Sequence, residues 1–161
     1  MNARKRMAWL AATAALGSGF ALAGPSAAHA GAAPVSVSPA TVINHSCGPR
    51  TSPSKVSHPY DFVHTTIGKA RIALRNGNRG NTEYYWARIT GGAVGNTVWL
   101  DWADTESGQK IKSWHLCGPY KIHSGHDNYT LAVNYVYDGV RQRHFRACGH
   151  HAGVTRCTGW E

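Results

Sequence analysis

Two β-rich runs joined by a turn cluster make up the stretch Lys69–Thr90, KARIALRNGNRGNTEYYWARIT. In its first run Ile72 and Leu74 alternate with arginines, so apolar side chains share one face of a strand and charged ones the other. The cluster Asn76–Asn81 consists of Asn, Gly and Arg and favours a turn, and Glu83–Thr90 is rich in strand-forming aromatic residues. The stretch therefore predicts a strand, a turn and a returning strand.

Further short runs with the same character follow at regular spacing. They are Thr97–Ala103, Ile111–Cys117, Tyr129–Tyr137 and Val140–Cys148. The last two flank Asp138-Gly139, a dipeptide that supplies the positive φ of a type I′ turn, and this indicates a hairpin. Gly118-Pro119 is expected to break the strand ladder. Because no helical period is visible after the N-terminal segment, we predict an all-β fold: an antiparallel β-sandwich, Ig-like or a small barrel.

The core is predicted from the side chains that share a face of each run. The expected core residues are Val98, Leu100, Trp102, Trp114, Leu116, Leu131, Val133, Tyr135 and Tyr137.

The N-terminal segment has the layout of a secretory signal peptide. Arg4-Lys5-Arg6 precedes an apolar run from Met7 to about Ala23, and the small residues Ala28 and Ala30 follow in an A-x-A pattern. The apolar run is shorter than the roughly 20 residues that a membrane span requires. We therefore expect cleavage between Ala30 and Gly31, a secreted, extracellular product and no membrane association after cleavage.

All four cysteines, Cys47, Cys117, Cys148 and Cys157, lie after the expected cleavage site. An even number of cysteines in an oxidising compartment predicts two disulfides, for which three pairings are possible. We expect Cys148–Cys157 to close a short terminal loop and Cys47–Cys117 to tie the N-terminal segment to the middle of the domain. Zinc is the competing use of cysteine, but the chain has no C-x2-C pair.

Cleavage leaves 131 of the 161 residues, enough for one domain, which we place at 60–161. It also removes three of the 17 basic residues, so 14 remain against 8 acidic ones and the net charge is +6. Such a charge favours acidic partners such as wall polymers, acidic glycans or acidic proteins. Nucleic acid is not expected, because the chain is exported and its basic residues form no dense run.

Residues 31–59 are rich in Pro, Ser and Ala and are predicted to form an extended arm tethered at Cys47. An extended segment of this kind binds other proteins by adding a strand to their sheets, with alternate side chains giving specificity. The candidate partner-binding residues are Val35, Val37, Thr41, Val42 and Ile43. The alternative is an arm without a binding role.

Catalytic and metal-binding patterns are weak. Ser52-Pro-Ser-Lys55 matches S-x-x-K formally but lies in a Pro-rich stretch, and oxidised cysteines supply no thiolate nucleophile. A small secreted hydrolase would instead need a histidine with an acid, and the acids to test are Asp101, Asp104, Glu106 and Asp127. The pairs His123/His126 and His150/His151, with His144 nearby, lack a recognised zinc pattern and are expected to be solvated loop residues. We expect no enzyme, no metal and no cofactor.

Aromatic residues offer a second binding hypothesis, a platform for sugar rings in a cell-wall or carbohydrate-binding module. The candidates are Tyr84, Tyr85, Trp86, Trp99, Trp102, Trp114 and Trp160. Because side chains alternate along a strand, Trp99 points to the other face of the sheet from Trp102, and Tyr85 to the other face from Tyr84 and Trp86. A single core layer therefore does not hold all of these aromatic residues.

Several short stretches are similar to those of a group of small secreted proteins from actinobacteria. They are Leu74–Asn81 (LRNGNRGN), Tyr85–Ile89 (YWARI), Val98–Trp102 (VWLDW), Cys117–Tyr120 (CGPY), Phe145–Gly149 (FRACG) and Cys157–Trp160 (CTGW). The likeness covers about residues 69–160. Proteins of this size and pattern resemble the adaptor of umbrella toxin particles, which links lectin subunits to the repeat-built stalk of a large antibacterial toxin. The resemblance implies a non-catalytic adaptor for other secreted proteins that acts in competition between bacteria.

Overall fold

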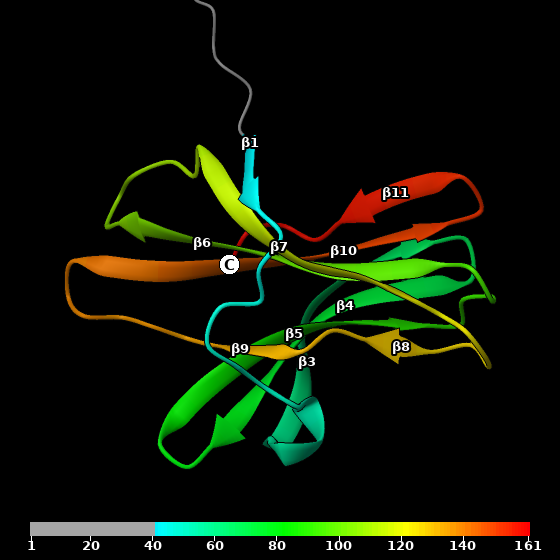
Figure 1. The fold of residues 1–161 in the computed structure, drawn as a ribbon, viewed down its shortest axis with the longest axis horizontal. Coiled ribbons are helices and arrows are strands. Elements are labelled where there is room, and N and C mark those ends of the chain that lie inside the picture. The colour runs from blue at the N-terminus through cyan, green and yellow to red at the C-terminus, as the bar shows by residue number, and fades with distance from the viewer. Residues whose placement is uncertain (1–40) are drawn as a thin grey trace, which may run out of the picture. The chain divides into compact units, whose positions relative to one another are not determined.

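The computed structural model describes residues 41–161, which form two β-sheets and one short 3-10 turn, η1 (Pro53–Lys55). Sheet A has the order β1 (Thr41–Asn44), β7 (Ser113–Lys121), β6 (Thr97–Glu106), β10 (Arg141–His151), β11 (Val154–Cys157). Sheet B has the order β2 (Arg50–Thr51), β9 (Ala132–Asn134), β5 (Thr82–Thr90), β4 (Ala70–Arg79), β3 (Ser57–Ile67), and β8 (Asn128–Tyr129) also pairs with β5. The predicted two-disulfide β-sandwich is confirmed (Figure 1).

The core lies between the two sheets. Ile72 and Leu74 of β4 pack with Val98 and Leu100 of β6, and all four side chains are fully buried. Phe145 of β10 joins the same cluster. Burial of each such side chain stabilises the fold by roughly 1.5–3 kcal/mol. The alternation predicted for β4 and β6 is therefore confirmed.

The predicted turn between the runs of Lys69–Thr90 is shorter than expected. β4 and β5 pair from Arg71↔Thr90 to Arg79↔Thr82, so only Gly80 and Asn81 remain in the loop. Asn76, expected in the turn, is instead a buried strand residue whose side-chain N–H donates to Tyr60 Oη at 2.9 Å and Glu83 Oε1 at 2.6 Å. These bonds satisfy the buried amide donor of Asn76, whereas its Oδ1 has no partner within residues 41–161.

The hairpin predicted around Asp138-Gly139 is wrong. The run before it contributes β8 and β9 to sheet B, and the run after it becomes β10 in sheet A, where it pairs along its length with β6. A single bridge, Tyr137↔Gln142, joins the two runs. The Asp138 carboxylate accepts the N–H groups of Val140 and Arg141, so a turn forms and connects one sheet to the other. It is not the predicted type I′ turn, because Gly139 has a positive φ but Asp138 does not. Tyr137, expected in the core, is 62% exposed because it lies at this crossing.

The face of β7 that turns toward the core also differs from the prediction. Cys117 is in the core, so Trp114 and Leu116 lie on the opposite face of sheet A, away from sheet B. Both are only partly buried, and their assignment to the core is wrong. Alternation shows which residues share a face but not which face turns inward. β7 also continues through Gly118-Pro119, which is cis, with an irregularity in its pairing to β6 between Val98 and Leu100.

The N-terminal part of the described chain crosses from one sheet to the other. β1 pairs with β7 in parallel, the exception to the predicted antiparallel arrangement, and β2 pairs with β9 at the edge of sheet B. The boundary expected between residues 59 and 60 falls inside β3, and the described part of the arm supplies strands to both sheets. Short strands flanked by prolines have too few residues to show alternation in the sequence.

The expected disulfide pairing, Cys47–Cys117 and Cys148–Cys157, is confirmed, and all four cysteines are oxidised. Disulfides of this kind indicate folding in an oxidising environment. Within residues 41–161 no helix is long and apolar enough to cross a membrane. The expected signal-peptide residues Ala28, Ala30 and Gly31 lie outside the described residues.

Candidate functional site

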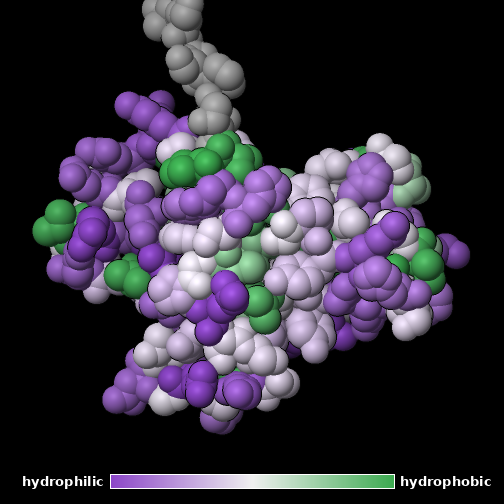
Figure 2. All heavy atoms as spheres, viewed as in Figure 1, coloured by the Kyte–Doolittle hydropathy of each residue, from purple (hydrophilic) through white to green (hydrophobic). Residues whose placement is uncertain are grey.

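β1, which is part of the predicted arm, is the outermost strand of sheet A. Thr41 pairs with Ser113 and Val42 with Trp114 of β7, and within residues 41–161 no strand pairs with the other edge of β1. The side chain of Ile43 is 57% exposed and that of Val42 is 40% exposed. Figure 2 shows a hydrophobic patch over β1. An open strand edge with exposed aliphatic side chains is suited to pairing with another chain.

The last residue of β1 and the chain directly after it are held to sheet A by polar contacts and a disulfide. Asn44 Oδ1 lies 2.7 Å from His115 Nδ1, and the indole N–H of Trp102 donates to the carbonyl of Ser46 at 2.8 Å. Cys47 is then bonded to Cys117 of β7. These contacts hold this part of the arm in a defined place beside sheet A.

Gly48 continues this attachment, because its backbone lies against the Trp102 ring. Its φ is +54°, and a Cβ at this position would lie 2.9 Å from the Trp102 ring atom Cζ2. Both features require glycine.

Trp102 itself packs against charged and aromatic side chains of neighbouring strands of sheet A. Its ring stacks on that of His115 with the centroids 4.1 Å apart, and the Arg143 guanidinium lies 4.5 Å from the Trp102 centroid. Arg143 donates two hydrogen bonds to Asp104, at 2.7 and 2.8 Å, and further bonds to Asn134. Burial lowers the pKa of His115; the Asp104 carboxylate opposes this shift and the Arg143 guanidinium adds to it. His115 is therefore favoured in its neutral form.

A second cluster covers the face of sheet A that is turned away from sheet B. The guanidinium of Arg146 lies 4.7 Å from the ring centroids of both Trp114 and Trp160. Its Nε donates to Asp101 Oδ2 at 2.8 Å, and Asp101 is almost fully buried. Burial raises the pKa of Asp101, and the hydrogen bond and charge of Arg146 only partly offset this. The predicted core role of Trp114 is replaced by this packing on the outer face.

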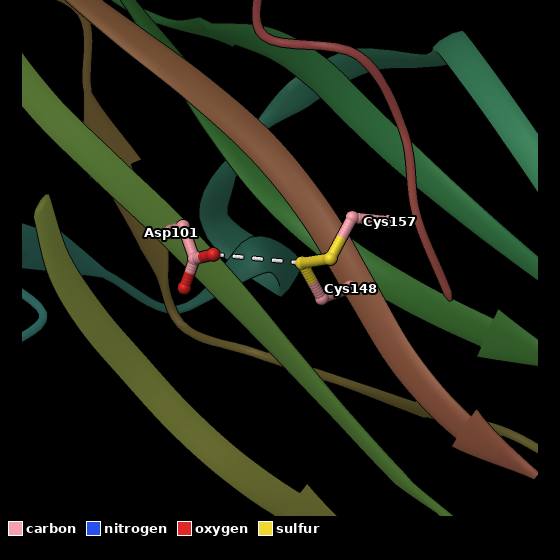
Figure 3. A group of neighbouring side chains, drawn as sticks. All are labelled: Asp101, Cys148 and Cys157. Atoms are coloured by element: carbon pink, nitrogen blue, oxygen red, sulfur yellow. Dashed lines mark hydrogen bonds between the residues drawn. A yellow bond between two sulfur atoms is a disulfide. The ribbon is translucent and has the colours of Figure 1, made fainter. Parts of the chain in front are cut away.

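Asp101 also touches the terminal disulfide (Figure 3). Cys148 Sγ lies 3.5 Å from Asp101 Oδ2, and because a disulfide sulfur carries no hydrogen, this is a contact and not a donated bond. Among residues 41–161, Asp101, Cys148 and Cys157 form the one group of three potential metal ligands. The oxidised sulfurs supply no thiolate, so this group is a carboxylate in contact with a neutral disulfide and lacks the ligands of a metal site.

The histidine pairs do not converge. His126 Nδ1 lies 3.0 Å from the carbonyl of Gly92, and His123 is exposed. His150 and His151 end strand β10, where a loop was expected, and they face Thr155 and Asn96 respectively. Across residues 41–161, no hydrogen bond joins a histidine ring to a carboxylate.

The candidate acids instead engage other partners. Asp101 binds Arg146, Asp104 binds Arg143, Asp127 binds Arg88, and Glu106 accepts a bond from Gln109. Ser52 Oγ is bonded to Ser54 Oγ, one residue before Lys55 at the end of the 3-10 turn.

The candidate aromatic platform is divided among three places. Trp102 is in the main core, as predicted, and Tyr85 joins it there. Trp86 lies in a small separate cluster with Val56, Ala132 and Tyr84, so Tyr85 faces away from Tyr84 and Trp86 as the alternation predicted. Trp99, Trp114 and Trp160 are partly buried. None of these side chains belongs to an exposed, coplanar set.

Of the candidate partner-binding residues, Thr41, Val42 and Ile43 belong to β1, whereas Val35 and Val37 lie outside the described residues. The sequence interpretation missed Arg143 and Arg146. The sequence does indicate that Arg143 faces inward, because a residue two positions before the core residue Phe145 shares its face of the strand. Arg146 has no such signal, since its two Trp neighbours come from β7 and from the C-terminal segment after β11.

Comparisons of this chain with models of protein families, with curated proteins and with solved structures find no match.

Proposed function

We propose that this protein is a secreted, non-catalytic adaptor that binds other secreted proteins through the edge of β1. The observation that carries the proposal is the state of β1: its far edge is unpaired within residues 41–161, and Val42 and Ile43 are exposed on it. Soluble domains usually protect such edges with charges or prolines, and β1 has neither. A partner strand would gain backbone hydrogen bonds along β1 and apolar contacts with its side chains.

The attachment of β1 supports the same proposal. The Cys47–Cys117 disulfide and the Trp102–Ser46 hydrogen bond fix the chain beside β1, so a partner would meet a strand that is already ordered. Pre-ordering reduces the entropy lost on binding. Secretion is proposed from the predicted signal peptide together with the oxidised cysteines. The resemblance to the adaptors of umbrella toxin particles extends the proposal to a link between lectin subunits and a toxin stalk.

The test uses Ile43→Asp with Val140→Asp as its matched control. Both positions are β-branched aliphatic residues on the surface, 57% and 63% exposed, but Val140 lies in the turn between the sheets. The mature protein and both variants are purified from culture medium of the producing organism, and co-purified proteins are quantified by mass spectrometry. We expect Ile43→Asp to reduce capture of the partners at least tenfold and Val140→Asp to leave capture unchanged.

Deletion of residues 31–44 provides a second variant. We expect it to fold, because Cys47 and the Trp102–Ser46 bond remain, and to lose capture completely. Equal recovery of the same proteins by the wild type, Ile43→Asp and the deletion variant would show that β1 is not the interface.

A further inference from the structure

The outer face of sheet B, turned away from sheet A, carries a groove of about 410 Å³. Arg75, Trp86 and Arg88 line it from β4 and β5, and Asp127 and Tyr129 line it from the segment that includes β8. Pro53, Ser54 and Pro59 form the opposite wall. Its volume lies within the range of small-molecule sites, roughly 300–1,000 Å³. The groove is separate from β1, which belongs to the other sheet.

The groove combines an exposed aromatic ring with ordered polar groups. Tyr129 is 47% exposed, whereas Trp86 is buried. Arg88 Nη2 donates to Asp127 Oδ2 at 3.0 Å, and both side chains remain accessible, at 36% and 50%. Such a pair presents hydrogen-bond donors and acceptors in a fixed arrangement, which suits neighbouring hydroxyl groups of a sugar. The Tyr129 ring offers a flat surface on which the C–H face of the sugar ring packs.

The charge of the groove favours an acidic ligand. The guanidinium of Arg75 lies 5.5 Å from the Trp86 centroid, and its Nε approaches Asp61 Oδ1 at 2.9 Å. Asp61 also pairs with Arg71, so a single carboxylate is shared by two arginines. Of the residues that line the groove itself, Arg75 and Arg88 are cationic and Asp127 is anionic, so the lining carries one excess positive charge. The remaining positive charge is suited to a carboxylate, which a guanidinium binds with two parallel hydrogen bonds.

We propose that this groove binds an acidic saccharide, a short segment of a polymer that contains uronic-acid residues. The Tyr129 ring stacks on a sugar ring, the Arg88–Asp127 pair binds hydroxyl groups, and Arg75 and Arg88 bind the carboxylate. A linear phosphodiester polymer shares the negative charge but has no ring to stack on Tyr129. This binding function goes beyond the adaptor role and uses a different sheet.

The test measures binding of the mature protein to oligogalacturonate by titration calorimetry, with a neutral dextran oligosaccharide and poly(glycerol phosphate) as comparison ligands. We expect oligogalacturonate to bind, and its affinity to fall as the salt concentration rises. Dextran and poly(glycerol phosphate) should each bind at least tenfold more weakly than oligogalacturonate. Tyr129→Ala should weaken binding at least tenfold. Arg88→Gln should abolish the preference for the acidic over the neutral sugar.

The chain contains matched controls for both substitutions. Tyr137 is also an exposed tyrosine, and Arg141 is also an exposed arginine paired with an aspartate, Asp138. Tyr137→Ala and Arg141→Gln should bind as the wild type does. The proposal is overturned if oligogalacturonate does not bind at millimolar concentration, if the phosphate polymer binds as well as the sugar, or if the control variants lose as much affinity as the groove variants. Ile43→Asp should retain saccharide binding, which separates this site from the proposed β1 interface.

Discussion

Replacing Arg146 by alanine should be among the most damaging single substitutions on the outer surface of sheet A. Its Nε donates to Asp101 at 2.8 Å, and its guanidinium lies between Trp114 and Trp160. The substitution leaves the Asp101 carboxylate, whose side chain is 2% exposed, without a cation, and its Oδ1 already has no hydrogen-bond partner within the described chain. Breaking a buried ion pair by removing one partner costs about 3–5 kcal/mol.

The expected loss can be measured by urea unfolding and by thermal melting. In a domain of this size it corresponds to a fall in Tm of roughly 12–20 °C. Arg141→Ala is the control, because this arginine forms an exposed ion pair with Asp138, and it should leave stability almost unchanged. The double variant Arg146→Ala/Asp101→Asn should recover much of the loss, because the uncompensated charge is gone.

The pH dependence of the loss identifies its cause. Burial already raises the folded-state pKa of Asp101 above 3.8, and loss of Arg146 removes the contacts that lower it. Between the unfolded and folded pKa values the native state binds more protons than the unfolded state, so stability falls as the pH rises. The deficit of Arg146→Ala should therefore be smallest near pH 4 and largest at pH 7. A deficit below about 1 kcal/mol, or one that is equal at both pH values, would refute the argument that an unpaired buried carboxylate is its source.

Three further tests concern the disulfides and His115. Replacing Cys47 and Cys117 by alanine should cost about 4 kcal/mol in urea unfolding, because this bond closes a loop with a sequence separation of 70. The same change at Cys148 and Cys157, with a separation of 9, should cost about 3 kcal/mol, and a larger loss than for the long loop would contradict the chain-entropy explanation. Because the pKa of His115 is lowered in the folded state, the wild type should lose stability as the pH falls below 6.5. The variant His115→Gln should lose less stability over the same pH interval. Parallel pH profiles of the two proteins would exclude His115 as the source of the loss.

Local patterns predicted the strands and the disulfides well where partners are near in sequence. The face shared by Ile72 and Leu74 follows from a period of two, and the Cys148–Cys157 pair follows from short spacing, which the β10–β11 hairpin confirms. The type I′ signal at Asp138-Gly139 failed because the two flanking runs pair more extensively with β5 and β6 than with each other. A turn preference of a few residues is outweighed by such strand pairing.

The amino-acid sequence alone determined the class of this protein. Alternating apolar residues, frequent turn residues and an even number of cysteines are local properties, and together they specify a disulfide-linked β-fold. The tertiary structure decided which strands are neighbours and which face of each strand is buried. Those outcomes depend on contacts between residues far apart in the chain, such as β1 with β7 and Arg146 with Trp114 and Trp160. The composition of the arm already made Thr41, Val42 and Ile43 candidates, but only the pairing of β1 with β7 shows which edge of the strand is open. The groove lined by Arg88 and Tyr129 arises from long-range contacts alone.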